Sequence, residues 1–307
     1  MTRTAMFFAT LAIAAGTMLA ALPAQAQPPR VFVSGSGNDS NACTYAAPCR
    51  TFAQAFSVVA PNGEIDVLDP AGYGPLTVTG PVSIQGHGYA SITQTAGCGT
   101  GTAITVSAGT SDTILLNGLL IDGVGSGCFG IWVKSAGSVQ IVDCVIRHFD
   151  TDLYFYPSNA AILSVSNTIV SDSFGDAYGI NINTQPSSSP LVTLDGVTAT
   201  GNGTGVGFYG SQVVTLTNSN VSDNSGDGVD VGGGGQAIVK TSVVANNGGT
   251  GVNAYAGTTW LARNAIYGNA AGVNQNGGTI NSFGDNDFAN NNGMDVVNGP
   301  LGTATTE

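Results

Sequence analysis

The sequence has little charge, and positive charge is the scarcest kind. Of 307 residues, 8% are charged, with 7 basic groups against 19 acidic groups and a net charge of −12. Ordinary soluble domains are about 25% charged. A protein that binds the phosphate backbone needs clustered Lys and Arg side chains. Because these cations are few and scattered, the composition excludes a nucleic-acid partner.

Helix-forming composition and long apolar runs are scarce as well. The 45 glycines destabilise helix interiors, which argues against coiled coils and helical bundles. Beyond the first 26 residues, the sequence has no apolar run of the 18 or more residues that a membrane helix needs, so we expect no membrane span. Hydrophobic residues make up 42% of the chain, which is too many for charge-driven disorder.

The N-terminus has the pattern of a secretory signal peptide. Arg3 gives a basic start, an apolar run follows over 5–22, and Ala24-Gln25-Ala26 supplies a small-x-small cleavage site. The alternative is a membrane anchor, but Pro23 and the shortness of the run argue against it. We therefore predict cleavage near Ala26 and a secreted or periplasmic protein.

All five cysteines follow this leader, where disulfides are permitted. Cys43 and Cys49 bracket a short loop, and Cys98 and Cys128 fall in Gly-rich turns one repeat apart. We predict these two disulfides, with Cys144 left over; the alternative is that some cysteines are small buried thiols. With two His and no Cys-x-x-Cys pair, a zinc site is not expected.

A repeat is the strongest signal in the chain. Eight segments align at anchor residues spaced 26, 24, 28, 23, 23, 22 and 22 residues apart. The anchors are Asn117, Asp143, Asn167, Asp195, Asn218, Thr241, Arg263 and Asp285. So regular a period indicates stacked structural repeats.

Each repeat has the same internal order. An apolar-alternating strand precedes the anchor, and a later strand is opened by Gly, from Gly130-Ile131 to Gly293-Met294. The segments between turns are too short for helices. Six residues past the anchors stand Asn224, Asn247, Asn269 and Asn291, whose amides can bond from coil to coil as a ladder.

Three short strands per coil, an Asn ladder and inward Val, Ile and Leu resemble the right-handed parallel β-helix repeat family of the pectin-lyase-like superfamily. The resemblance covers residues 64–298 and implies an all-β solenoid of about ten coils, a rod about 50 Å long at ~4.8 Å per coil. The alternative is a β-sandwich, which would not keep side-chain columns at fixed offsets.

The resemblance also implies an N-terminal cap. In residues 51–60, Phe52, Phe56 and Val59 fall on one helical stripe and Thr51 can cap the helix. The predicted organisation is a signal peptide over 1–26, a cap over 27–63, a parallel β-helix over 64–298 and a tail over 299–307.

The enzyme motifs typical of this superfamily are absent from the sequence. Lyases of the superfamily use calcium held by clustered carboxylates with an Arg or Lys as base, and the repeats here hold few cations. The paired Asp of polygalacturonases is missing, and Gly86-His87-Gly88 comes before any such pair, so we interpret it as a turn.

One polar column still suggests catalysis. Five residues past the anchors stand Asp122, His148, Asp172, Thr200, Asp223, Asn246, Gly268 and Asn290. Stacking would put His148 between Asp122 and Asp172, each ~4.8 Å away, with Arg147 beside it, where carboxylates can orient an acid or base. The alternative is a polar turn column that satisfies backbone groups.

A second column suggests glycan binding. One residue past the inward Ile or Val of the Gly-opened strand stand Trp132, Tyr154, Asn181, Gly207, Asp230, Asn253, Asn274 and Asp295. Rings that stack on sugar faces beside amides and carboxylates are typical of sugar sites. The alternative is that the rings are simply tolerated on a sheet surface. Phe155, Tyr156, Tyr178, Phe208 and Tyr209 lie nearby in sequence.

We therefore predict a secreted, non-catalytic, monomeric protein that binds a polysaccharide or another cell-surface ligand along its exposed sheet. No cofactor is expected, although Asp227 and Asp230 offer oxygen ligands that suit calcium. The alternatives are a polysaccharide lyase, hydrolase or epimerase, and a structural spacer at the cell surface.

Overall fold

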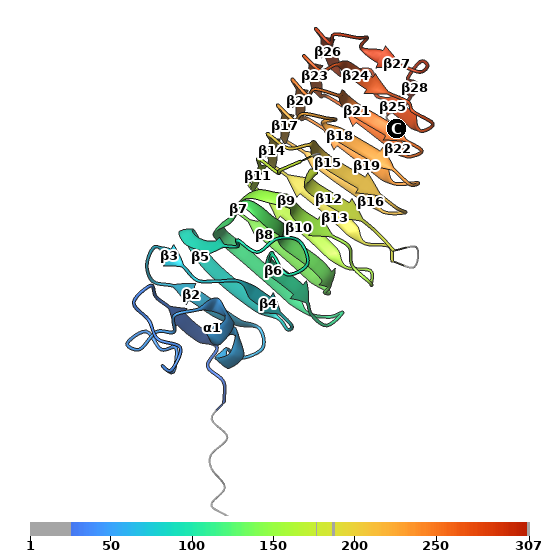
Figure 1. Cartoon of the computed structure of the whole chain (residues 1–307). Helices are drawn as coiled ribbons and strands as arrows, with labels where there is room; N and C mark the ends of the chain where they lie inside the picture. Colours follow the sequence, from blue (N-terminus) through green and yellow to red (C-terminus); the bar gives the residue numbers. More distant parts are fainter. Residues whose placement is uncertain (1–25, 176, 186–187, 306–307) are drawn as a thin grey trace, which may run out of the picture.

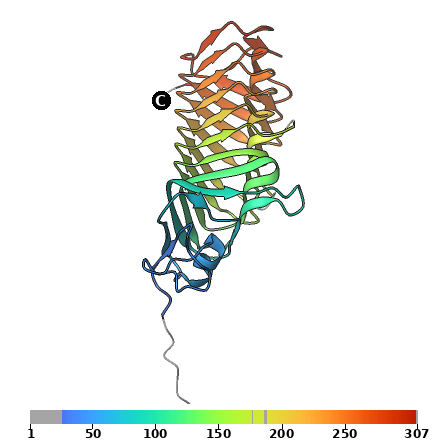
Figure 2. The ribbon, with the colours of Figure 1, turned by 60° about the vertical axis from the view of Figure 1, so that its left-hand side comes forward.

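The chain forms a parallel β-helix. The computed structural model describes residues 26–175, 177–185 and 188–305, and in this part of the chain 28 strands and one helix follow one another. Each coil contributes strands to three sheets that run along the rod (Figure 1), and the coils stack along one axis (Figure 2). The predicted all-β solenoid with a short capping helix is confirmed. The leader predicted over 1–26 lies outside the described residues except for Ala26.

The three sheets are named here in the order in which a coil visits them, and three long strands turn corners and so belong to more than one sheet. The first sheet contains β1 (Arg30–Val33), β2 (Gly63–Val67), β5 (Val82–Thr93), β7 (Thr113–Ser135), β8 (Ser138–Val142), β10 (Ile162–Ser166), β13 (Leu191–Asp195), β16 (Val213–Thr217), β19 (Gln236–Lys240), β22 (Thr258–Ala262), β25 (Thr279–Ser282) and β28 (Gly302–Thr303). The second sheet contains β3 (Ala71–Gly72), parts of β5 and β7, β9 (Val145–Phe155), β11 (Ile169–Ser171), β14 (Thr198–Thr200), β17 (Asn220–Ser222), β20 (Val243–Ala245), β23 (Ala265–Tyr267) and β26 (Asp287–Ala289). The third sheet contains β4 (Leu76–Val78), β6 (Thr102–Ser107), parts of β7 and β9, β12 (Tyr178–Asn183), β15 (Thr204–Tyr209), β18 (Val229–Gly232), β21 (Thr250–Tyr255), β24 (Ala271–Asn274) and β27 (Val296–Val297).

Alternation along each strand builds the core. In β10, Leu163 and Val165 are buried while Ser164 between them faces outward. Leu163 pairs with Val139 of the preceding coil and with Val192 of the next, so apolar side chains form continuous inward columns. No coil buries this face alone, which is why stability requires neighbours.

The turn between the first and second sheets takes the left-handed backbone. Asp143, Asn167 and Asn218 have φ values of 53°, 47° and 51°. In two coils the predicted anchor is one residue early, because Gly118 (φ 63°) and Gly196 (φ 64°) take the turn. Asn117 and Asp195 instead are the last paired residues of their coils in the first sheet, opposite Val142 and Thr217.

The predicted asparagine ladder is present, and all its members except the half-buried Asn291 are buried. The Nδ2 groups of Asn224 and Asn247 each donate to the Oδ1 of the next amide at 2.9 Å, and Asn269 donates to Asn291 at 3.1 Å. Asn202 joins the ladder, since its backbone N–H donates to Asn224 Oδ1 at 3.0 Å. The ladder ties the coils together inside the rod.

Glycine opens the strands of the third sheet because a Cβ at that position would collide with the neighbouring coil. A Cβ on Gly251 would lie 2.6 Å from the Gly272 carbonyl oxygen and 2.8 Å from Asn269 Nδ2, although its φ is not positive. Gly293-Met294 does not continue this column, so that prediction is wrong. The last strand is Val296–Val297, Asp295 takes the glycine position opposite Gly272, and Met294 is exposed.

In the coil between those of Gly130 and Gly179, Asp152 takes the glycine position. It is fully buried, its Oδ1 accepts from the Phe149 N–H at 3.3 Å, and its Oδ2 has no hydrogen-bond partner. Burial holds the pKa of Asp152 well above its ordinary value. The folded state therefore favours the protonated carboxyl more strongly than the unfolded chain does.

The raised pKa of Asp152 predicts that the free energy of unfolding depends on pH. The folded protein binds this proton more tightly than the unfolded chain, where the pKa is about 3.9. Asp152 therefore destabilises the fold progressively as pH rises above about 4. We expect Asp152→Asn to gain free energy of unfolding relative to wild type between pH 4 and pH 8, measured by urea unfolding. A difference that stays constant over this range would contradict the assignment.

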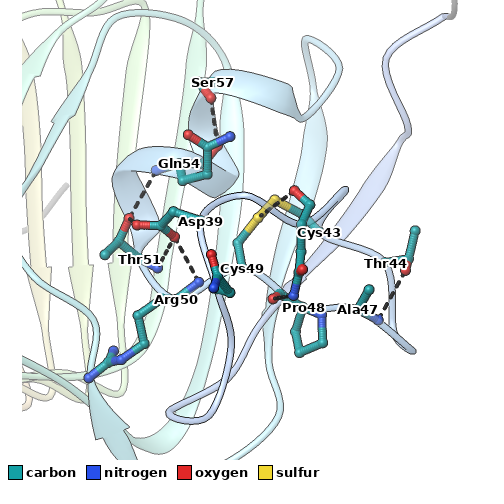
Figure 3. Close-up of a disulfide and its surroundings, with 12 residues drawn as sticks. Asp39, Cys43, Thr44, Ala47, Pro48, Cys49, Arg50, Thr51, Gln54 and Ser57 are labelled. Atoms are coloured by element: carbon teal, nitrogen blue, oxygen red, sulfur yellow. Dashed lines mark hydrogen bonds between the residues drawn. A yellow bond between two sulfur atoms is a disulfide. The ribbon is translucent and has the colours of Figure 1, made fainter.

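The N-terminal end is covered by α1 (Phe52–Val58), as predicted. Thr51 caps it, because its Oγ1 accepts from the Gln54 N–H at 3.2 Å. Asp39 supports this cap by accepting from the backbone N–H groups of Arg50 and Thr51 at 2.8 and 2.9 Å (Figure 3). The helix packs its buried Phe52 against the first coils.

Both predicted disulfides, Cys43–Cys49 and Cys98–Cys128, are present. Cys43–Cys49 closes the loop beside α1 (Figure 3). Cys144 is free and buried, and burial raises the pKa of its thiol to about 11. Its thiolate is therefore suppressed at neutral pH.

Among the described residues, no helix has the length and apolar character needed to cross a membrane.

Candidate functional site

The outward side chains of the third sheet form one column, as the repeat predicts. Trp132 pairs with Tyr154, Tyr154 with Asn181, and Asn181 with Gly207. The column then continues through Asp230, Asn253 and Asn274. Its last member is Val297, not Asp295, because the final strand begins later than expected. The column members that we expect to contact a ligand thus share one face of the rod; they are Trp132, Tyr154, Asn181, Asp230 and Asn253.

Aromatic rings gather where this column begins. Tyr154 stacks on Phe129 and Tyr156 with centroid distances of 5.0 and 5.9 Å, and Trp132 lies 5.1 Å from Phe129. The Nζ of Lys134 lies 3.7 Å from the centroid of the Trp132 ring, a cation–π contact. Burial raises the pKa of the Tyr154 hydroxyl. Two other aromatics near the column in sequence, Phe155 and Phe208, point into the core instead.

A groove lies beside these rings, and we call it the Trp132 groove. Its volume is about 530 Å³, within the usual range for small-ligand sites. The third sheet supplies Thr77, Thr105, Trp132 and Lys134, while α1 supplies Ala53 and Phe56. The remaining lining residues are Pro75, Leu76, Gln94, Gly99, Thr100 and Thr102. It therefore offers an aromatic ring, one cation and several hydroxyl groups.

Farther along the column, polar groups bond to one another. The Tyr209 hydroxyl donates to Asp230 Oδ2 at 2.5 Å, and Asn253 Nδ2 donates to Asp230 Oδ1 at 3.1 Å. The Tyr178 and Tyr209 hydroxyls are 3.0 Å apart. Burial raises the pKa of Asp230, while the Oδ1 atoms of Asn181 and Asn253 are buried without a partner. This stretch has acceptors still to be satisfied.

The carboxylates considered for calcium are largely occupied. Both oxygens of Asp230 accept the hydrogen bonds just described, and Asp227 Oδ1 accepts from the Thr250 N–H at 2.6 Å. Among the described residues, the one compact group of three metal-ligating types is Cys98, Cys128 and Asp150. Its two sulfurs are joined in a disulfide and so are not thiolate ligands.

Of the four candidate catalytic residues, Asp122 contacts Arg147 and His148. Asp122 accepts from Arg147 Nε at 2.9 Å and lies 3.0 Å from His148 Nδ1. Burial acts to raise the pKa of Asp122, but hydrogen bonds from Val124, His148 and Arg147 hold it below its ordinary value. No hydrogen bond or ion pair links His148 to Asp172 in the described part of the chain.

The column through His148 differs from the prediction in two coils. Asp122 pairs with Arg147, and Thr200 pairs with Ser171, so both belong to the column one residue earlier. The cause is the displaced anchors, because Gly118 and Gly196 take the turns. None of the four candidates, Asp122, Arg147, His148 and Asp172, lines the Trp132 groove.

Gly86-His87-Gly88 forms a turn, as interpreted from the sequence. His87 and Gly88 have φ values of 56° and 79°, and His87 Nε2 lies 2.6 Å from Asp66 Oδ1. The motif lies where β5 passes from the first sheet to the second.

The sequence argument missed the walls of the Trp132 groove. Thr77 and Thr105 continue the column of Trp132 toward the N-terminus, before the first repeat anchor. The alternation in Leu76-Thr77-Val78 and Ile104-Thr105-Val106 is the local signal that both threonines face outward. Lys134 stands two residues after Trp132, on the same outward face. The contribution of α1 carries no local signal, because it depends on how the cap packs.

Comparison with known proteins supports the fold. A family model described as right handed beta helix region matches residues 178–306. The structure is similar to pectate lyase Pel9A, with a TM-score of 0.62 and 18% identity over 88% of this chain and 78% of that chain. It is also similar to the A-module of the mannuronan C-5 epimerase AlgE4 of Azotobacter vinelandii (TM-score 0.48, 16% identity, 80% and 90% covered) and to a rhamnogalacturonan lyase (TM-score 0.37, 14% identity, 86% and 74% covered). A search of curated proteins finds no match.

Proposed function

Because this chain carries the right-handed β-helix repeat, we propose that it is a secreted protein that binds a polysaccharide along its third sheet. The observation that carries this proposal is the Trp132 groove, which opens beside a column of aromatic and amide side chains. A Trp face suits the apolar face of a sugar ring, and amides and hydroxyls suit its hydroxyl groups. Pectate lyase Pel9A, which shares the fold, takes a polysaccharide as its named substrate, although a shared fold alone does not assign a function.

Export fits the same proposal. Two disulfides are typical of proteins in the periplasm or outside the cell, and the sequence over 1–26 has the pattern of a cleaved leader.

The lining of the groove argues against hydrolysis of a ligand bound there. Glycoside hydrolysis uses a pair of carboxylates that flank the scissile bond, and the residues that line the groove include no Asp, Glu or His. Lys134 is its one titratable side chain, and its ammonium group rests on the Trp132 ring. We therefore propose that a polysaccharide binds in this groove without being hydrolysed.

The test is electrophoresis through gels that contain pectate, alginate, galactan or hydroxyethylcellulose. We expect one of these polysaccharides to retard the wild-type protein. Trp132→Ala and Tyr154→Ala should each weaken that retardation about tenfold, which is about 1.4 kcal/mol. Tyr267→Ala is the matched control, since Tyr267 is an exposed aromatic on the second sheet.

Thermal melts verify that each variant is folded, because Trp132 and Tyr154 also pack on Phe129. Retardation that survives both substitutions would remove the groove from the proposal. Retardation by none of the four polysaccharides would favour the structural spacer instead.

A polysaccharide lyase or epimerase is the second candidate, and the contacts of Asp122 with Arg147 and His148 favour it. A carboxylate that orients His beside a cation is a plausible arrangement for proton transfer. Incubation with pectate and alginate, with and without calcium, tests this directly. Unsaturated product or changed uronate composition that disappears in His148→Gln would support the enzyme.

A further inference from the structure

A second aromatic surface lies on the first sheet, away from the column already described. We call it the Trp260 surface, and it consists of Ile238, Lys240, Trp260, Arg263 and Phe283. Ile238 and Trp260 are paired on neighbouring strands β19 and β22, and both face outward. Phe283 follows β25, where its N–H donates to the Leu261 carbonyl at 3.1 Å. Three apolar side chains thus form one continuous patch.

Two adjoining hollows are built on this patch. One of about 280 Å³ contains Trp260, and one of about 440 Å³ contains Lys240 and Arg263. Ile238 and Phe283 line both hollows. A ligand of two linked units could therefore occupy both, with one unit on the indole and the other beside the cations.

The two cations of this surface have no internal partner. Arg30 and Arg147 form ion pairs with Glu64 and Asp122, but in the described part of the chain neither Lys240 nor Arg263 has an ion pair or a side-chain hydrogen bond. Both side chains are exposed. Asp285 also lines the second hollow, and its Oδ1 is bonded to the backbone N–H of Arg263 at 3.0 Å.

This arrangement is unusual in so acidic a chain, which has 7 basic and 19 acidic groups. Two unpaired cations beside one hollow attract an anion, and carboxylates are bound well by Arg and Lys. A symmetric contact with a second copy would instead bring like charges together at this patch.

We propose that the Trp260 surface binds a glycan that carries carboxylates. One sugar ring stacks on Trp260, and the carboxylate of the adjoining sugar lies between Lys240 and Arg263. This site lies on the first sheet and does not depend on the Trp132 groove.

The chain has two tryptophans, Trp132 and Trp260, so Trp132→Phe leaves Trp260 as the sole indole reporter. Titration of this variant with tetragalacturonate is expected to change its fluorescence saturably. The fully methyl-esterified tetramer, which lacks the charges, should bind at least tenfold more weakly. Raising the salt concentration should also weaken binding of the charged tetramer.

In the same background, Lys240→Gln combined with Arg263→Gln should weaken tetragalacturonate binding at least tenfold. Arg30→Gln is the matched control, since it removes an exposed cation from β1 at the other end of the rod. No fluorescence change, equal binding of the ester, or full affinity in the double variant would overturn the proposal. The gel assay tests the Trp132 groove separately from the Trp260 surface. Retardation that is lost in Trp132→Ala and kept in Trp260→Ala supports the groove, whatever the fluorescence titration shows for the Trp260 surface.

Discussion

Replacing Asn247 by alanine is expected to lower the free energy of unfolding by about 3–5 kcal/mol. The side chain is 2% exposed. Its Oδ1 accepts from the N–H and the Nδ2 of Asn224 at 3.2 and 2.9 Å, and its Nδ2 donates to Asn269 and to the Val221 carbonyl at 2.9 and 3.2 Å. Alanine removes all four of these hydrogen bonds inside the core, where each group left without a partner costs about 1–3 kcal/mol. Asn224 Nδ2 keeps its bond to the Ala199 carbonyl and Asn269 Oδ1 keeps its bond from the backbone N–H of residue 247, so the Asn224 N–H is the group most exposed to this cost.

Urea unfolding followed by circular dichroism measures this loss. Asn220→Ala is the matched control, because Asn220 is an exposed asparagine on β17 and its replacement should change the free energy of unfolding by no more than about 0.5 kcal/mol. If Asn247→Ala loses less than about 1 kcal/mol, the ladder is not what holds the coils together.

The second large effect is expected for Gly251→Ala, which should cost about 3 kcal/mol. The new methyl group would lie 2.6 Å from the Gly272 carbonyl oxygen, a backbone atom that cannot move aside without opening the space between two coils. It would also press on Asn269 Nδ2 at 2.8 Å and so disturb the ladder.

Gly80→Ala is the comparison, since a Cβ at Gly80 would meet nothing within 4 Å and its φ is not positive. We expect that variant to unfold within about 0.5 kcal/mol of wild type. Equal stability of the two variants would show that the glycine column does not set the spacing between coils.

The spacing between coils matters for function because it sets the spacing of the outward column. Asn253 lies on β21 two residues after Gly251, and it pairs with Asp230 of the preceding coil. The ladder and the glycine column therefore position the side chains that we propose to contact a polysaccharide. A variant that opens the stack should weaken binding even where the column itself is intact.

Much of this fold is predictable because a stacked coil repeats its requirements. The same offset brings inward apolar residues, ladder amides and outward columns into register, so the period alone predicts which side chains share a face. Thr51 and the stripe of Phe52 and Phe56 likewise predict the capping helix from local preferences.

Register is harder to predict where two neighbouring residues suit the same turn. In Asn117-Gly118 and Asp195-Gly196 either residue tolerates the left-handed backbone. Glycine takes it in both coils, since it has no Cβ to strain. That one-residue difference is enough to move Asp122 out of the column of His148.

Features made by packing are not visible in the repeat. The Trp132 groove needs α1 as a wall, and the position of α1 depends on how the cap meets the first coils. The Trp260 surface had a local signal, because Thr259-Trp260-Leu261 places an outward indole between inward residues. What was not visible was that Phe283, from the end of the next strand, lies beside it.

The most direct test of the account is an NMR titration of the two indole N–H groups. Trp132→Phe and Trp260→Phe assign the two resonances, and the ligand is a hexasaccharide of the polysaccharide that retards the protein in gels. If the ligand lies along the third sheet, the Trp132 resonance shifts saturably as the hexasaccharide is added. A hexasaccharide that binds while the Trp132 resonance stays in place would contradict the account.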